Sequence, residues 1–207
     1  MKGLLVCFEG IDGAGKRTQA ELLGKWLQQE GFATKNYSYP DYEGVYGKII
    51  RDYLNKKIEM GVGEFFFLQM LDKVKDAIRI TGERNAGMVV IADRYVDSQV
   101  AYQSAGGFNY EAAKKIIGLS GMPVPDIVFY IDVTIEISMK RKASQKGDLD
   151  RHESFAAYLK KVKEYYDMIY KEKHNTWVKI DSAKDIDSVH EEVVAAVEKL
   201  LDRKGGK

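Results

Sequence analysis

A glycine-rich segment near the start of the chain holds the residues best suited to chemistry. Residues 8–19 read FEGIDGAGKRTQ, and Lys16 comes after three closely spaced glycines, Gly10, Gly13 and Gly15. Such glycines let the backbone turn tightly and direct its N–H groups inward, and the N-terminus of a following helix adds partial positive charge. The amino group of Lys16 then reaches the outer phosphates of a nucleotide. The spacing predicts a loop that binds a nucleoside triphosphate, in a protein that moves a phosphoryl group.

One position departs from the usual pattern of such a loop. The lysine is normally followed by Ser or Thr, whose hydroxyl ligates magnesium, whereas here Arg17 follows and the hydroxyl comes one residue later, at Thr18. A chance glycine-rich turn or a decayed nucleotide site is the alternative interpretation. The apolar run 4–8 and the apolar-periodic segment 22–27 are the strand and helix that the motif requires, so they favour a nucleotide site. Nucleoside monophosphate kinases resemble this variant, since many of them read Gly-Lys-x-Thr.

A second cluster, Asp93 and Arg94, follows the apolar run 88–92. A carboxylate at the end of a buried strand, facing a phosphate loop, is well placed to hold Mg2+ through water. The forked guanidinium of Arg94 can bind two phosphate oxygens at once. A structural ion pair at the end of the strand is the alternative. The hydroxyl, amide and ring that come next are sufficient to orient a base and a sugar, and they favour a substrate site: Ser98, Gln99 and Tyr102.

The third feature is a charged stretch between two helical patterns. Residues 140–153 read KRKASQKGDLDRHE and are centred on a glycine. A run of this kind is ordinarily a solvated loop. The alternative is a small mobile lid that closes over a nucleotide and brings cations to the moving phosphoryl group. We expect the lid interpretation because a phosphate-binding loop is present in the same chain.

The remaining sequence must build the scaffold that positions these clusters. Apolar runs without helical period, typical of buried strands, alternate with segments of helical period. This alternation predicts an α/β fold, namely a P-loop three-layer sandwich whose five-stranded parallel sheet is flanked by helices. The glycine-rich loop, Tyr39 with Pro40, Asp93 and Asp132 all follow expected strands, so they lie at the carboxyl edge of the sheet, where ligands bind. The expected strands are 4–8, 33–39, 88–92, 127–131 and 176–180, and the expected helices 16–30, 42–55, 64–84, 110–119, 135–142, 153–172 and 186–201.

Bulk composition limits the class of protein. The chain has 207 residues, 45% hydrophobic and 30% charged, with a net charge of +1 and a single cysteine, Cys7. This length suits one domain over residues 1–207. The near-neutral charge argues against a nucleic-acid partner, and one cysteine allows neither an intrachain disulfide nor a cysteine metal site. Without an apolar run of membrane-spanning length or a signal-peptide pattern, we expect a cytoplasmic enzyme.

From Leu4 to about Tyr170 the chain resembles the thymidylate kinase (dTMP kinase) family. The resemblance is carried by the glycine-rich loop, by DRYVDSQVAY at residues 93–102, by PVPD at 123–126 and by GDLDRHE at 147–153. The loop alone is moderately specific, whereas the four motifs in this order are highly specific. The resemblance implies the P-loop kinase fold, ATP as the phosphoryl donor, dTMP as the acceptor, Mg2+ as the metal and a homodimer.

The resemblance also implies roles for individual residues. The catalytic residues would be Lys16, Asp12, Arg94 and Arg151. Asp12 would accept the 3′-hydroxyl of the acceptor sugar, Arg94 would bind the acceptor phosphate, and Tyr102 would favour deoxyribose. ATP would be held by Gly10, Gly13, Ala14, Gly15, Lys16, Arg17 and Thr18, together with Arg141, Lys142 and Lys146 of the lid. The acceptor would be held by Asp12, Tyr39, Gln69, Lys73, Arg94, Ser98, Gln99 and Tyr102. The metal would be held by Asp93, with Asp12 and Glu9.

Two departures from the family pattern concern the acceptor base. Where members usually carry a Phe that stacks on thymine and an Arg four residues later, this chain reads Gln69 and Lys73. Phe65 or Phe66 would stack instead if the alignment is one turn off, although packing in the core explains them equally well. Asp41 also stands where arginine is common. These positions keep open a kinase of another pyrimidine monophosphate, such as dUMP, UMP or CMP. Arg17 keeps open a non-catalytic P-loop regulatory module.

Overall fold

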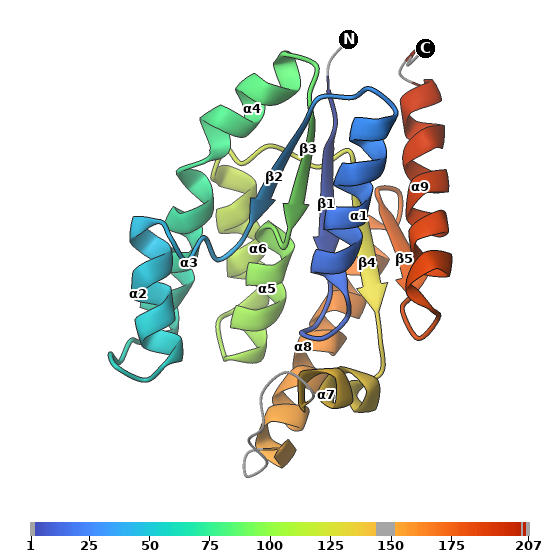
Figure 1. Cartoon of the computed structure of the whole chain (residues 1–207). Helices are drawn as coiled ribbons and strands as arrows, with labels where there is room; N and C mark the ends of the chain where they lie inside the picture. Colours follow the sequence, from blue (N-terminus) through green and yellow to red (C-terminus); the bar gives the residue numbers. More distant parts are fainter. Residues whose placement is uncertain (1–2, 144–151, 204, 206–207) are drawn as a thin grey trace.

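A single parallel sheet organises the molecule. The computed structural model describes residues 3–143, 152–203 and 205, and its five strands lie in the order β2-β3-β1-β4-β5, with every neighbouring pair parallel. The strand arrowheads in Figure 1 point the same way, so the carboxyl ends of the strands share one edge. The five-stranded parallel α/β fold expected from the sequence is confirmed. The strands are β1 (Leu5–Glu9), β2 (Thr34–Ser38), β3 (Val89–Asp93), β4 (Ile127–Asp132) and β5 (Trp177–Asp181).

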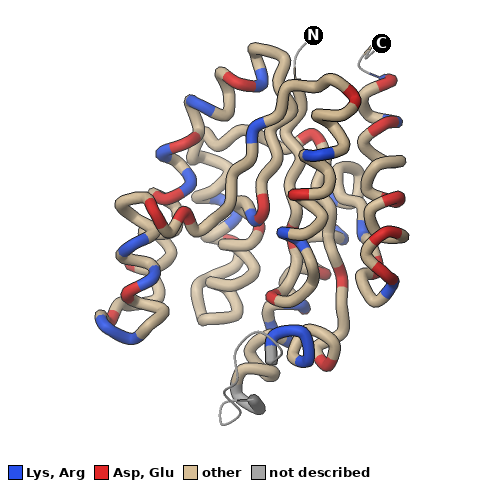
Figure 2. Tube along the Cα trace, viewed as in Figure 1, with Lys and Arg blue, Asp and Glu red and all other residues tan. Residues whose placement is uncertain are grey.

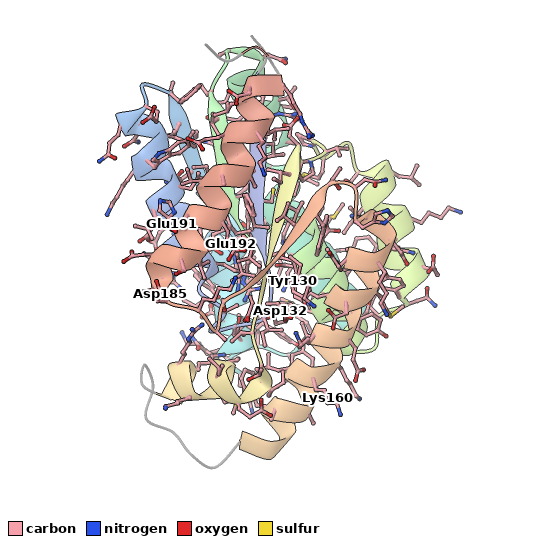
Figure 3. All side chains as sticks on the ribbon, turned by 90° about the vertical axis from the view of Figure 1, so that its right-hand side faces the viewer. Tyr130, Asp132, Lys160, Asp185, Glu191 and Glu192 are labelled. Carbon is pink, nitrogen blue, oxygen red and sulfur yellow. The ribbon has the colours of Figure 1, made fainter. Side chains whose placement is uncertain are left out.

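Helices cover both faces of this sheet. Figure 3 views the molecule from the β5 edge, with α9 and α1 on one side of the strands and α8 and α6 on the other. Tyr130 and Asp132 lie on β4 between these layers, while Lys160 on α8 and Glu191 on α9 lie on the outside. The helices are α1 (Lys16–Gln29), α2 (Val45–Leu54), α3 (Val62–Val74), α4 (Ala77–Asn85), α5 (Val96–Ala105), α6 (Tyr110–Leu119), α7 (Ile135–Ala143), α8 (His152–Lys173) and α9 (Ile186–Arg203).

The three central strands form the middle of the core. Each side chain of β1 is buried, because helices cover the sheet on both faces and a parallel strand then has no solvated side. Phe8 of β1 stacks on Phe129 of the neighbouring strand with ring centroids 5.2 Å apart. This rigid centre fixes where β1 ends and where the following loop begins.

Two helical segments differ from the sequence expectation. The pattern 64–84 forms two helices, α3 and α4, because Asp76 interrupts it. Its buried carboxylate accepts hydrogen bonds from Tyr39, Lys75 and Arg79. Helix α5 is absent from the sequence expectation, since most of its side chains are buried, polar ones included, and the segment has no hydrophobic period to read.

Among the described residues, no helix is long and apolar enough to cross a membrane.

Candidate active site

The loop between β1 and α1 adopts a conformation that needs glycine. Gly10 and Gly13 have φ values of +141° and +75°. A Cβ on Gly10 would lie 2.4 Å from the Ile131 carbonyl oxygen, and one on Gly13 would lie 2.7 Å from that of Ser138. The hydroxyl of Ser138 also donates to the Asp12 carbonyl at 2.6 Å. The loop is therefore pressed against the end of β4 and the start of α7.

A cavity of about 620 Å³ opens above this loop and the first turn of α1. Nearly every residue expected to hold a nucleoside triphosphate lines it, Gly10 being the exception among those that the structure describes. Its far wall comes from α1, from the turn after β5 and from α9. We call this space the donor cavity; its lining includes Gly13, Ala14, Gly15, Lys16, Arg17, Thr18, Asp93, Arg141 and Lys142, with Gln19, Ser182, Lys184, Ile186 and Val189 at the far wall.

Lys16 and Arg17 are adjacent in sequence but differ in environment. Lys16 is 5% exposed and donates to the Ile11 carbonyl at 2.7 Å, so its amino group is held inside the loop. Burial lowers the pKa of Lys16 to about 8, and the nearby Arg94 adds to the effect. The side chain of Arg17 is exposed and pairs with Glu21 at 2.8 Å. Arg17 therefore lies along the outside of α1 at the rim of the donor cavity.

A second cavity of about 700 Å³ lies beside the first. Seven of the eight residues expected to bind the acceptor line it, and other residues complete the lining. We call it the acceptor cavity. The expected residues are Asp12, Tyr39, Gln69, Lys73, Arg94, Ser98 and Tyr102, and the others are Pro40, Tyr42, Arg51, Leu54, Asn55, Phe65, Gln103, Lys142, Phe155 and Tyr158.

Three charged residues, Asp12, Arg94 and Lys142, line both cavities and form the boundary between them. Arg94 pairs with Asp12 and hydrogen-bonds the Tyr102 hydroxyl at 3.2 Å. The Lys142 amino group lies 2.8 Å from the other Asp12 oxygen. Burial alone would raise the pKa of Asp12, but Arg94, Lys16 and Lys142 hold it well below its usual range. The boundary thus carries two cations around one ionised carboxylate.

Lys73 is a buried cation in the wall of the acceptor cavity. It is 3% exposed, donates to the Gln69 carbonyl at 3.3 Å and lies 5.6 Å from the centre of the Tyr39 ring. Burial lowers the pKa of Lys73 to about 8. Tyr39 is fixed from behind, because its hydroxyl donates to Asp76 at 3.0 Å. Lys73 and Gln69 present polar groups where a stacking ring was expected from the family.

The two phenylalanines on α3 behave differently. Phe65 lines the acceptor cavity and packs against Tyr53 with ring centroids 4.1 Å apart. Phe66 is fully buried and stacks on Phe108 at 4.1 Å. Phe65 is therefore the residue of this pair that can reach a bound base, and Phe66 belongs to the core.

Two residues do not lie where the sequence interpretation placed them. Gln99 is fully buried outside the lining of the acceptor cavity, and its amide donates to the Phe66 carbonyl at 2.7 Å. One helical turn later, Gln103 lines that cavity. Glu9 is also fully buried and lines neither cavity, because both of its carboxylate oxygens accept hydrogen bonds from Tyr95, Ser98 and Tyr166. Glu9 therefore lies outside the cavity that would hold the metal, and its role in organising the metal stays a prediction.

Asp93 has the donor set expected for a metal held through water. It is the last residue of β3, it lines the donor cavity, and its Oδ1 atom is buried without a hydrogen-bond partner among the described residues. An unpartnered carboxylate oxygen beside a phosphate loop suits Mg2+, which keeps much of its water shell. The described part of the chain contains no cluster of three or more His, Cys, Asp or Glu side chains that could hold a metal unaided. The site therefore fits a metal bound mainly to phosphates and water.

Cations of the expected lid approach the loop from α7. Figure 2 shows Lys and Arg concentrated along this helix, at the edge where the strands end. Arg141 donates to the Gly13 carbonyl at 3.3 Å and to the Ser182 carbonyl at 2.7 Å, so it joins the loop to the turn after β5. Lys146 and Arg151 lie outside the described residues, and the lid interpretation of residues 140–153 stays a prediction there.

Comparison with known proteins agrees with this geometry. The thymidylate kinase family model matches residues 8–193. The chain belongs to the thymidylate kinase family. The thymidylate kinase of Thermoanaerobacter sp. (strain X514) is 34% identical, over 97% of this chain and 100% of its own length. That of Caldanaerobacter subterraneus is also 34% identical, over 100% of both chains, and that of Plasmodium falciparum is 29% identical, over 96% of this chain and 91% of its own.

One residue of the acceptor cavity was not predicted from the sequence, although its position in the sequence could have indicated it. Arg51 lines the acceptor cavity from α2, and its guanidinium lies 5.1 Å from the centre of the Tyr42 ring. An arginine on the inner face of an amphipathic helix, after a Pro-containing strand end, marks a candidate anion contact. Phe155 and Tyr158 had no such signal, because they line the cavity only once α8 packs beside α5.

Proposed function

We propose that this protein transfers the γ-phosphoryl group of ATP to dTMP, giving dTDP and ADP. The observation that carries the proposal is the wall shared by two cavities. A phosphate-binding loop lines one cavity, aromatic and polar side chains line the other, and Asp12, Arg94 and Lys142 border both. A phosphoryl group that crosses this boundary passes directly between donor and acceptor. Membership of the thymidylate kinase family supports the same reaction and acceptor.

Positioning and charge neutralisation account for the chemistry, since a phosphoryl transfer needs little covalent help. Lys16 binds the outer phosphates of ATP, and the loop N–H groups hold them in place. Arg94 binds the acceptor phosphate, and Lys142 lies where negative charge accumulates during transfer. Asp12, ionised between these cations, orients both and accepts a hydroxyl of the acceptor sugar. The attacking group is already an anionic phosphate, so a general base is not required.

We propose that Asp93 holds Mg2+ through water. When bound, the metal neutralises charge on the phosphates of ATP. The buried, unpartnered oxygen of Asp93 supports this assignment. Thr18 lies on the same cavity wall, one residue after the position where the usual magnesium-binding hydroxyl stands. The metal role of Asp12 stays a prediction, as does the catalytic role of Arg151.

Tyr102 supports selection of deoxyribose. Its hydroxyl lies 3.1 Å from Asp12 and 3.2 Å from Arg94, so the ring edge is fixed beside the place where the acceptor sugar meets the boundary. A ribose 2′-hydroxyl directed at this ring would lose its water without gaining a partner. Recognition of the base rests on Lys73, Gln69 and Phe65, which differ from the family pattern described above.

The experiment that tests the function is a coupled ADP-release assay with ATP and Mg2+ across dTMP, dUMP, UMP, CMP, dCMP, AMP and GMP. Highest turnover with dTMP is the expected result. A different preferred acceptor would reassign the pocket around Lys73 and keep the mechanism. ATP binding without turnover on any acceptor would contradict the proposal and favour a regulatory module.

We also propose that the enzyme is a cytoplasmic homodimer. The outer face of α3 exposes large apolar side chains, with Phe67 and Leu71 52% and 47% exposed, and Ile78 of α4 is 89% exposed. Apolar side chains grouped on one face support association with a second copy. Sedimentation velocity of the wild type and of Phe67→Lys tests the dimer, which the substitution is expected to dissociate. The cellular location stays a prediction, tested by fractionation.

A further inference from the structure

Glu9 is a fully buried carboxylate at the end of β1 that lines neither cavity. Its Oε1 atom accepts the backbone N–H groups of Tyr95 at 2.9 Å and Ser98 at 3.0 Å. Its Oε2 atom contacts the Ser98 hydroxyl and accepts the Tyr166 hydroxyl at 3.0 Å. All four neighbouring groups can donate. A side chain that only accepts is therefore needed at this position, and a carboxylate supplies it in its ionised form. Burial and the charge of Asp97 raise the pKa of Glu9, whereas the hydrogen bonds from Ser98 and the charge of Arg94 oppose this rise.

The Ser98 hydroxyl connects Glu9 to the boundary of the two cavities. A serine oxygen carries one hydrogen and two lone pairs. When the hydrogen is given to Glu9, the lone pairs are left for the other neighbours of Ser98 Oγ. One neighbour is the Arg94 guanidinium, whose Nη1 atom donates at 3.3 Å. The other is the Tyr166 hydroxyl, 2.8 Å away, whose single hydrogen goes either to Ser98 Oγ or to Glu9 Oε2. The direction of the serine hydrogen thus decides whether Ser98 can accept from Arg94.

Arg94 depends on such support because its backbone is unusual. Its φ is +65°, a left-handed conformation that a non-glycine residue rarely adopts. Its Nη1 atom donates to Ser98 Oγ and to the Gly10 carbonyl at 3.4 Å. Its Nη2 atom donates to Asp12 and to the Tyr102 hydroxyl. The inner nitrogen fixes the plane of the guanidinium, and that plane sets which oxygens of an acceptor phosphate the fork can meet.

We propose that Glu9 is a positioning residue for acceptor binding, because it holds the Ser98 hydrogen so that Ser98 Oγ remains an acceptor for Arg94. Tyr166 assists from α8 by contacting both Glu9 and Ser98. The chain of contacts runs from Glu9 on β1 through Ser98 on α5, which lines the acceptor cavity, to the guanidinium of Arg94. This inference rests on the proposed function, in which Arg94 binds the phosphate of dTMP.

The test is Glu9→Gln in the full-length enzyme, assayed with ATP, Mg2+ and dTMP. Glutamine keeps the volume but replaces one accepting oxygen with an N–H donor. The Ser98 hydrogen then turns to the Tyr166 oxygen, and the new N–H competes with Arg94 for the lone pairs of Ser98 Oγ. Loss of a hydrogen bond to a charged group is expected to raise the KM for dTMP about tenfold. The KM for ATP and kcat are expected to change less than about twofold, since the groups that hold the donor are untouched.

A merely structural role would give a different pattern. It would lower the melting temperature and the active fraction while leaving both KM values unchanged, and that outcome overturns the inference. Asp132→Asn is the control, because Asp132 is a partly buried carboxylate at the end of β4 that pairs with Lys163 and Lys179 and lines neither cavity. The KM for dTMP is expected to stay at the wild-type value in this control.

A second variant keeps the test decisive if Glu9→Gln fails to fold. Tyr166→Phe removes only the assisting hydroxyl, so a rise of about threefold in the KM for dTMP is expected, with the KM for ATP unchanged. An unchanged KM for dTMP in the folded Tyr166→Phe variant would then overturn the inference. Absence of dTMP turnover in the wild type would instead contradict the proposed function, which separates the two failures.

Discussion

The amino group of Lys142 lies 2.8 Å from a carboxylate oxygen of Asp12, and both residues border the donor and acceptor cavities. Asp12 belongs to the phosphate-binding loop, whereas Lys142 belongs to the last turn of α7, 130 residues further along the chain. Lys142 also lies 4.3 Å from the centre of the Phe155 ring, at the start of α8. One ion pair thus joins the loop to the helix pair that flanks the expected lid.

This position makes Lys142 a candidate for a cation that acts in the transition state. Replacing Lys142 with Ala is expected to lower kcat on the order of 100-fold, with smaller changes in both KM values, because charge at the moving group is stabilised mainly during transfer. Lys142→Arg is expected to recover part of the loss. Lys140→Ala is the matched control, since Lys140 is an exposed lysine on the same helix outside both cavity linings. Equal kcat in Lys142→Ala and wild type would exclude this role.

We expect ATP binding to depend on pH through the charge of Lys16. Burial lowers the pKa of Lys16 to about 8, so in the free enzyme its charge is present below this pH and is lost as the pH rises. We therefore expect kcat/KM for ATP, measured at saturating dTMP, to be flat below pH 8 and to fall above it. The fall in kcat itself is expected at higher pH, because bound phosphates stabilise the charged amine. A kcat/KM profile that stays flat to about pH 10 would contradict the assignment.

The sequence predicted the fold well because its strongest signals are local. Continuous apolar strands and the glycine loop are readable in a short window. Asp93 ends β3, and Lys16 opens the helix after the loop that follows β1, so the topology places both at one edge of the sheet. Helix α5 has no readable period, since polar residues such as Gln99 are buried in it. The α3–α4 break depends on Asp76, whose partner Tyr39 is distant in sequence.

The residues that were expected in the site but lie outside both cavities have one physical explanation. Glu9 and Gln99 both lie in segments that contain true cavity residues, yet their side chains point into the protein. Which way a side chain points at the end of β1 or along a fully buried helix depends on neighbours such as Tyr166, brought in from α8. Charge and spacing identified the correct segments, but only packing distinguished Gln103 from Gln99.

Alanine at Gly13 tests the close approach of the loop to α7. A Cβ there would meet the Ser138 carbonyl at 2.7 Å, in addition to the strain of a positive φ. We expect Gly13→Ala to lose about 2–4 kcal/mol of unfolding free energy and most ATP affinity, whereas Gly31→Ala loses only about 1–2 kcal/mol from left-handed strain. Gly31 also has a positive φ, but a Cβ added to it would meet no atom within 4 Å. Thermal melts and ATP titrations compare the two; equal affinity in both variants would argue against the contact.

We expect dTMP binding to depend on pH through Lys73. This dependence is separable from that of Lys16, because saturating ATP occupies the phosphate-binding loop that holds Lys16. Burial lowers the pKa of Lys73 to about 8, so its charge is present below this pH and is lost above it. If the charged amine bonds a base carbonyl, kcat/KM for dTMP at saturating ATP falls as the pH rises through about 8. Lys73→Met keeps the apolar stem and is expected to raise the KM for dTMP about tenfold and to abolish this alkaline fall. An alkaline fall that persists unchanged in Lys73→Met would assign base recognition to Gln69 and Gln103 instead.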